Sequence, residues 1–189
     1  MKRSVLIIFL ISMIFPDRYY VDTDESSVFW IGRKVTGEHY GTIDIKSGYV
    51  DVDGNQITGG EFFIDMASIE VLDMDDKYNK KLQDHLKSSD FFTVEEFPLA
   101  SFKIKEMYDF FMIENIGFKG ELTVKDVTID YRVPASVSIN DSVAVSIGVM
   151  DIDRTAFGII YGSGSFFEDI ADRAIDDNFT LKFRLIAKK

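Results

Sequence analysis

The stretch Asp76–Phe102, DKYNKKLQDHLKSSDFFTVEEFPLASF, decides the fold, because it holds the one strong helical pattern of the chain. Tyr78, Leu82 and Leu86 recur every four residues, so they share one face of a helix. We expect a helical excursion over about residues 74–93. The pattern leaves two roles open: a helix packed on a sheet, or a helix that closes one end of a barrel over an apolar cavity.

Outside this excursion, apolar and polar residues alternate with the period of two that is typical of strands. Gly48, Asp53-Gly54-Asn55 and Gly59-Gly60 supply expected turns between alternating segments. The expected strands cover residues 28–33, 43–45, 49–52, 62–66, 99–104, 110–118, 131–139, 143–149 and 179–185. About eight strands with tight turns predict an all-β, antiparallel sandwich or barrel, in which the last strand would pair with the first.

Length and charge restrict the function. The 189 residues are enough for one domain with a sizeable core. Asp and Glu outnumber Lys and Arg by 32 to 21, and the net charge of −11 repels nucleic-acid phosphates and anionic membrane surfaces. We therefore expect no nucleic-acid partner. The chain contains no Cys, which excludes disulfides, a thiolate nucleophile and zinc–cysteine sites.

The N-terminus has the pattern of a secretory signal. Lys2-Arg3 precedes the apolar run Val5–Phe15, in which only Ser12 is polar and which is too short to span a bilayer. We expect residues 1–16 to be a signal segment and residues 17–189 to form the mature domain, periplasmic or secreted from a bacterium, without stable membrane insertion. A retained N-terminal strand or anchor is the alternative, because no small-x-small pair precedes Pro16-Asp17.

Several motifs resemble the YceI-like family of bacterial lipocalin-like barrels that bind polyisoprenoid chains. DHLKSSDFF and EEFPLASF match the family's signature, and WIGRKVTGEHYG and GGEFFIDMASI resemble its first hairpin and the strand before its helix. GELTVKDVT resembles G-x-L-T-x-K-G-x-T, with Asp126 in place of the usual Gly. IDRTAFGIIYGSGS resembles I-x-R-x-x-F-G-x-x-Y and lacks the Lys-Ser/Thr of a phosphate loop. The resemblance covers about residues 22–187.

This resemblance implies an eight-stranded antiparallel lipocalin-like β-barrel with a hollow interior, formed by a single domain. It implies a carrier or store of a long-chain lipophilic ligand, either a polyisoprenoid or a similar lipid such as an isoprenoid quinone or a fatty amide. No cofactor is implied. The residues alone do not decide between a hollow and a filled interior, although an eight-stranded barrel is just wide enough for one small ligand. The oligomeric state is also left open, with a homodimer among the alternatives.

The candidate ligand-binding residues fall into three groups. One set would line the barrel wall, a second would close its end, and a third would meet a ligand head group or lie beside the Gly-rich motif. They are Trp30, Phe62, Ile64, Met66, Phe102, Leu122, Val145, Ile147, Phe183 and Leu185 for the wall, Leu82, Phe91 and Phe92 for the end, and His39, Tyr40, Arg154, Phe157 and Tyr161 for the rest. For each of them, packing in a solid core is the alternative.

Catalytic and metal-binding patterns are weak. His39 and His85 are the only histidines, and no His-Glu-x-x-His or Gly-x-Ser-x-Gly motif occurs. We expect no metal site and no enzyme activity. Asp65 and Arg154 each interrupt an apolar alternation, so a buried Asp65–Arg154 pair is one hypothesis and separate partners at the rim are the other. A small-molecule enzyme and a filled-core interaction module are the alternative functions.

Overall fold

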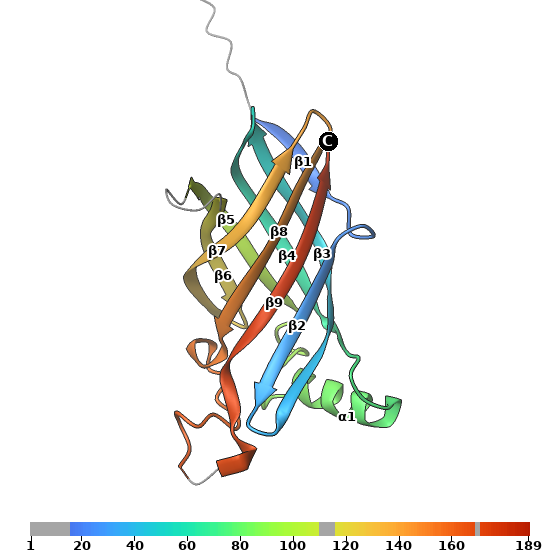
Figure 1. Ribbon diagram of the computed structural model, residues 1–189, viewed down its shortest axis with the longest axis vertical. Helices are drawn as coiled ribbons and strands as arrows, with labels where there is room; N and C mark the ends of the chain where they lie inside the picture. The colour runs from blue at the N-terminus through green and yellow to red at the C-terminus, as the bar shows by residue number, and fades with distance from the viewer. Residues whose placement is uncertain (1–15, 110–115, 169–170) are drawn as a thin grey trace, which may run out of the picture.

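Eight antiparallel strand positions close into a barrel in the computed structural model, which describes residues 16–109, 116–168 and 171–189 (Figure 1). The strands are β1 (Asp17–Val21), β2 (Ser27–Lys34), β3 (Gly37–Asp53), β4 (Gln56–Val71), β5 (Leu99–Asp109), β6 (Ile116–Val124), β7 (Val127–Ile139), β8 (Val143–Asp153) and β9 (Ile175–Lys188). One helix, α1 (Asp76–Lys87), lies at one end, and short 3-10 turns cover Arg154–Phe157 and Ala171–Arg173. The predicted barrel with a helical excursion is confirmed.

Each strand from β2 to β9 pairs with the next one along the chain, and β9 returns to β2. Trp30 of β2 lies opposite Leu181 of β9, so the last strand closes the barrel against the first as expected. The expected strand over residues 110–118 lies partly outside the described residues, as do residues 1–15 of the expected signal segment.

β1 is a strand that the sequence analysis missed. Its residue Tyr20 lies opposite Tyr49 in the second half of β3, and Val21 lies opposite Ala187 near the end of β9. β2 pairs with the first half of β3 and the earlier part of β9. β1 and β2 therefore share a single strand position, because β3 is too long for β2 alone to cover.

Two expected turns are wrong, because Gly48 and Gly59-Gly60 lie inside the long strands β3 and β4. Gly48 lies opposite Phe62, and a Cβ at Gly48 would be 2.8 Å from Cδ1 of the Phe62 ring. Glycine at this position serves close approach of a neighbouring ring rather than a turn. The predicted turn at Asp53-Gly54-Asn55 is confirmed in outline, because β3 ends at Asp53 and β4 begins at Gln56.

α1 packs on β4 and partly covers one end of the barrel. Leu82 and Leu86 are half-buried and turn toward the interior, whereas Tyr78 is exposed, so only part of the expected apolar face is covered. Nζ of Lys87 donates a hydrogen bond of 2.6 Å to the Ala67 carbonyl, which ties the last turn of the helix to β4. The opposite end is filled by an apolar cluster that includes Tyr19.

Tyr19 and Tyr20 provide a matched test of β1 as part of the barrel. Tyr19 is 3% exposed and its hydroxyl donates to the Asn140 carbonyl at 3.1 Å, whereas Tyr20 is 62% exposed. Tyr19→Ala should lower the free energy of unfolding by about 3–5 kcal/mol, because it removes a buried ring and a hydrogen bond. Tyr20→Ala should change it by less than about 0.5 kcal/mol. Urea denaturation measures both, and equal small losses would show that β1 is only loosely attached.

Candidate functional site

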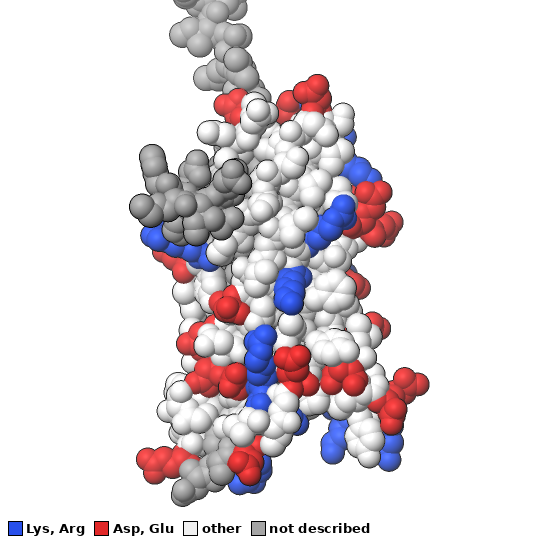
Figure 2. All heavy atoms as spheres, viewed as in Figure 1, with Lys and Arg blue, Asp and Glu red and all other residues white. Residues whose placement is uncertain are grey.

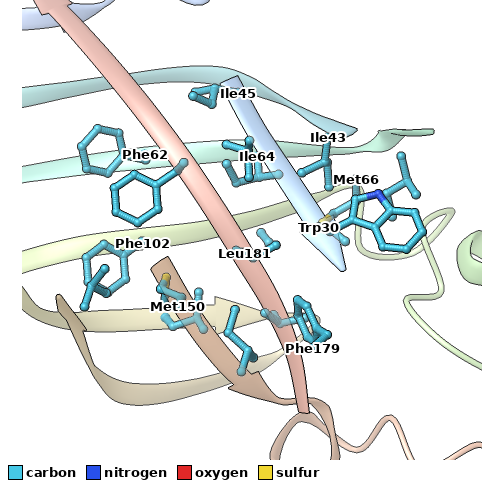
Figure 3. Close-up of a pocket in the computed structure, with 18 of the residues that line it drawn as sticks. Trp30, Ile43, Ile45, Phe62, Ile64, Met66, Phe102, Met150, Phe179 and Leu181 are labelled. Carbon is cyan, nitrogen blue, oxygen red and sulfur yellow. The ribbon is translucent and has the colours of Figure 1, made fainter. Parts of the chain in front are cut away.

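The barrel encloses a cavity of about 330 Å³, within the range of small-molecule pockets. Figure 3 shows side chains from several strands converging on this space, with Phe62 and Phe102 toward one end and Trp30 toward the other. The wall is apolar almost throughout. Polar side chains border it mainly near α1, where Arg33, Lys34 and His39 from the β2–β3 hairpin face Asp176 and Asn178 at the start of β9. We call this polar border the mouth.

The large rings of the wall lie against glycines of neighbouring strands. Phe183 of β9 lies opposite Gly148 of β8, and Trp30 of β2 lies opposite Gly41 of β3. A Cβ would come closer than 3.0 Å to an inward ring at four glycines, which pair as Gly41 with Trp30, Gly48 with Phe62, Gly120 with Phe102 and Gly148 with Phe183. Because each ring occupies the space that a neighbouring side chain would fill, the rings stay near the wall and the centre stays hollow.

Most of the predicted binding residues line this cavity. Phe62, Ile64 and Met66 of β4 share its inner face, as their alternation predicted. The other predicted residues on the wall are Trp30, His39, Leu82, Phe91, Phe92, Phe102, Leu122, Val145, Arg154, Phe183 and Leu185. The structure therefore brings them to one cavity, whereas their contact with a ligand stays a prediction.

Ile147 does not line the cavity, and its prediction as a wall residue is wrong. It is 53% exposed and lies opposite Arg184 on the outer face of β8 and β9. Figure 2 shows basic side chains along this face with uncharged surface beside them. The inner face of β8 carries Ala144, Ser146 and Gly148 instead, because the Phe183 ring leaves room only for small residues there.

Three predicted residues beside the mouth also lie off the wall. Tyr40 is exposed, as alternation along β3 requires once His39 points inward. Phe157 is 2% exposed and packs in the core cluster with Ile152 and Ile159. Tyr161 is exposed, and its ring contacts that of His85 near the end of α1 rather than lining the cavity. None of the three lines the cavity, and a contact of each with a ligand stays a prediction.

Aromatic contacts join the helical excursion to the β8–β9 connection. The Tyr161 ring centroid is 4.8 Å from that of His85 in an edge-on arrangement, and 5.4 Å from that of Phe91. Phe92 meets Phe179 edge-on at 6.3 Å, and both rings line the cavity. Edge-on ring pairs of this kind each stabilise by roughly 0.5–1.5 kcal/mol beyond area burial. Together they hold the two covering segments against each other across the end of the barrel.

Arg154 organises the β8–β9 connection. It is 4% exposed, and its guanidinium donates to the carbonyls of Ile159 at 2.7 Å and Tyr161 at 2.9 Å. Further hydrogen bonds reach the carbonyls of Asp176 at 2.9 Å and Ile175 at 3.1 Å. Burial lowers the pKa of Arg154, and the nearby Asp177 carboxylate opposes that effect. With these donors engaged, Arg154 holds backbone in place and does not serve as a free head-group contact.

The hypothesis of a buried Asp65–Arg154 pair is wrong. Arg154 lies 3.6 Å from Oδ1 of Asp177, while Asp65 accepts a hydrogen bond of 2.9 Å from Nζ of Lys46. That bond lowers the pKa of Asp65. Hydrogen bonds from Ser163 and Ser165 lower the pKa of Asp177, with a further contribution from the Arg154 charge. The two residues interrupt apolar alternations for separate local reasons.

Many wall residues were not among those predicted. Most are aliphatic residues of the strands, and two belong to the start of β9. Among them are Val28, Ile43, Ile45, Ile69, Leu86, Ala100, Ile104, Met150, Ile152, Phe179 and Leu181. Phe179 and Leu181 share their alternation with Phe183 and Leu185, so this signal was present in the sequence.

A family model for the YceI-like domain matches residues 19–187. The chain belongs to the YceI-like family. BcnA from Burkholderia cenocepacia resembles it with a TM-score of 0.67 and 25% identity, covering 88% of this chain and 99% of BcnA. A polyisoprenoid-binding domain from Saccharophagus degradans, implicated in plant cell wall breakdown, has a TM-score of 0.58 and 14% identity, covering 90% and 97%. A YceI protein from Campylobacter jejuni has a TM-score of 0.53 and 17% identity, covering 100% and 91%. A search of curated proteins finds no match.

Two further properties of this YceI-like chain concern the described residues only. Within residues 16–109, 116–168 and 171–189, no three His, Cys, Asp or Glu side chains group so that they could hold a metal ion. In the same ranges no helix has the length and apolar character needed to cross a membrane.

Gly148 and Gly59 test whether glycines keep the wall rings in place. Gly148→Ala should lower the free energy of unfolding by about 1–3 kcal/mol, because its Cβ would overlap the Phe183 ring and approach the Pro134 carbonyl at 2.6 Å. Gly59→Ala is the control, since the nearest atom to its Cβ is Oδ2 of Asp51 at 3.7 Å. Thermal melts of both variants decide the matter. Similar melting temperatures for the two would mean that the close approach at Gly148 is not required.

Proposed function

We propose that this YceI-like chain binds and carries or stores a long-chain lipophilic ligand inside the barrel, a polyisoprenoid or a similar lipid such as an isoprenoid quinone or fatty amide. The observation that carries this proposal is the long apolar cavity whose polar border is concentrated at the mouth. Family membership supports a lipid ligand, because one solved relative is a polyisoprenoid-binding domain. A cavity of this size is unlike the tight packing of a filled-core interaction module.

Burial of the chain of such a ligand supplies enough free energy for binding. About twenty carbons at roughly 0.8 kcal/mol each give a gross contribution near 16 kcal/mol. Ordering a flexible chain and losing its free motion remove a substantial part of this gain. Sub-micromolar binding is therefore attainable without a charged clamp, which agrees with an apolar wall whose buried Arg154 is already engaged by backbone carbonyls.

We further propose that the protein acts as a binding protein rather than an enzyme, and that it works in the periplasm or outside a bacterial cell. The basic start followed by the apolar run before Pro16 supports export. The near absence of polar groups from the cavity wall favours holding a lipid over transforming it. N-terminal sequencing of protein from its native host tests export, and an intact Met1 on protein from the cytoplasm would contradict it.

Gentle purification followed by native mass spectrometry tests the carrier proposal directly. A hydrophobic mass that co-purifies with the chain and dissociates on activation is the expected result. A co-purifying metal ion would point instead to an enzyme. A bare chain that also fails to take up added long-chain lipid would leave a structural or interaction role as the better account.

Ile64 and Phe63 are neighbours on β4 and test the cavity as the binding site. Ile64 lines the cavity, whereas Phe63 does not. Ile64→Trp should place a larger ring in the ligand's space, weaken binding of a fluorescent long-chain lipid by tenfold or more, about 1.4 kcal/mol, and leave the thermal melt nearly unchanged. Phe63→Trp should alter neither measurement by a comparable amount. A marked fall in the melting temperature of Ile64→Trp alone, of the kind that overpacking produces, would instead indicate a filled core.

A further inference from the structure

His39 stands where the apolar cavity meets a second, smaller hollow beside α1. It occupies the inward phase of β3, opposite Gly32 of β2, and lines the cavity at the mouth. The same side chain, together with Leu82, also lines the outer hollow of about 260 Å³. The remaining residues of this hollow are Met74, Tyr78, Lys81 and His85. A ligand whose tail lies in the barrel would therefore place its head beside His39.

Asp73 fixes the orientation of the His39 ring. Oδ2 of Asp73 lies 2.8 Å from Nδ1 of His39, and Oδ1 of the same carboxylate accepts a hydrogen bond of 3.1 Å from the backbone N–H of Tyr40. An ionised carboxylate can only accept hydrogen bonds, so Nδ1 carries the proton in this contact. In the neutral ring, Nε2 is then an acceptor. Among the described residues, Nε2 has no hydrogen-bond partner.

Three other polar groups of the cavity wall are already engaged or enclosed. The indole N–H of Trp30 donates to the carbonyls of Thr42 at 3.2 Å and Glu70 at 3.1 Å. The Arg154 donors bind backbone carbonyls, as described above. The hydroxyl of Ser146 is enclosed, with no hydrogen-bond partner among the described residues. Ser101, Asp176 and Asn178 also border the cavity, but among the described residues no hydrogen bond orients their side chains. His39 Nε2 differs from them because the Asp73 carboxylate fixes the direction of its ring.

We propose that the His39–Asp73 pair selects a neutral lipid whose head group donates a hydrogen bond, namely a long-chain alcohol. This inference rests on the proposed lipid-carrier function. The hydroxyl hydrogen of the ligand donates to Nε2 of His39, while the chain fills the barrel. A carboxylate or phosphate head only accepts hydrogen bonds, so it would face an acceptor backed by the negative charge of Asp73. Lys34 at the mouth and Lys81 in the outer hollow would favour such an anion, which makes an acid the necessary competitor in the test.

The experiment uses three probes with one chain and different heads: geranylgeraniol, its methyl ether and geranylgeranoic acid. Each is titrated into delipidated full-length protein and followed by the fluorescence of Trp30, the sole tryptophan and a wall residue. The alcohol should bind about two- to tenfold more tightly than the ether, which cannot donate, as expected for one neutral hydrogen bond. It should also bind more tightly than the acid.

Two variants separate the His39 acceptor from a structural role. His39→Phe keeps a ring but removes the acceptor, so the alcohol-to-ether ratio should fall to about one. Asp73→Asn tests the positioning residue. The Asn carbonyl should still accept from Tyr40 N–H, so its NH₂ group would face Nδ1 of His39. This arrangement moves the ring proton to Nε2, and binding of the acid should gain relative to that of the alcohol.

The outcomes distinguish this inference from the carrier proposal. Equal binding of alcohol and ether to the parent protein, or tightest binding of the acid, would overturn the head-group assignment and leave the carrier proposal standing. A uniform loss for all three probes in Asp73→Asn, with a lowered thermal melt, would assign that residue a structural role and also contradict the inference. If mass spectrometry verifies that the protein is free of lipid and no probe binds, both proposals fail.

Discussion

The close approach of inward aromatic rings to glycines on neighbouring strands is the constraint on which the rest of this structure depends. An eight-stranded barrel is narrow enough for side chains to fill it completely. Here Phe62, Phe102, Phe183 and Trp30 would fill it if they pointed to the axis. Glycines opposite or diagonal to them leave room along the wall, and each ring covers the backbone that a glycine exposes. Glycine, which usually weakens strands, thus helps here to keep the interior apolar and hollow.

A hollow barrel needs a different kind of closure at each end. At the end near β1, an apolar cluster including Tyr19 and Phe118 fills the interior, so this end contributes stability. At the other end, α1 contributes no fully buried residue. It is held by contacts such as the hydrogen bond from Lys87 to the Ala67 carbonyl and the edge-on contact of His85 with Tyr161. Segments with few buried contacts open at lower free energy than the core. Under the proposed function, this asymmetry would favour ligand exchange at the mouth. There Arg154 fixes the β8–β9 connection through the Ile159 and Tyr161 carbonyls.

Much of this fold could be predicted from the sequence, and the failures have physical causes. The inner face of β4 follows from a period of two, because Phe62, Ile64 and Met66 occupy every second position. The helix follows from the four-residue spacing of Leu82 and Leu86. The inward phase of β8 is hard to predict, since the exposed Ile147 and Val149 lie on its outer face while the inward Gly148 lies against the ring of Phe183. Hydrophobicity alone selects the wrong phase there. β1 was missed because its role follows from the length of β3. The interpretation of Gly48 as a turn had divided β3 into two shorter strands.

Under the proposed function, a cavity so uniform in its wall would need polar groups at its mouth to discriminate between ligands. Burial of a hydrocarbon chain is nearly indifferent to chain identity, because its free energy follows the apolar area removed from water. Discrimination must then come from the few polar atoms that reach the ligand, and a polar atom contributes direction only if its own orientation is fixed. At the mouth, Asp73 holds both the backbone of Tyr40 and the ring of His39, so the carboxylate sets the direction and the proton of the imidazole together. The helix supplies Leu82 and the strand supplies His39 at one point where the cavity and the outer hollow meet. Under the proposed function, tail burial would determine how tightly a lipid is held, and the oriented ring of His39 would select its head group.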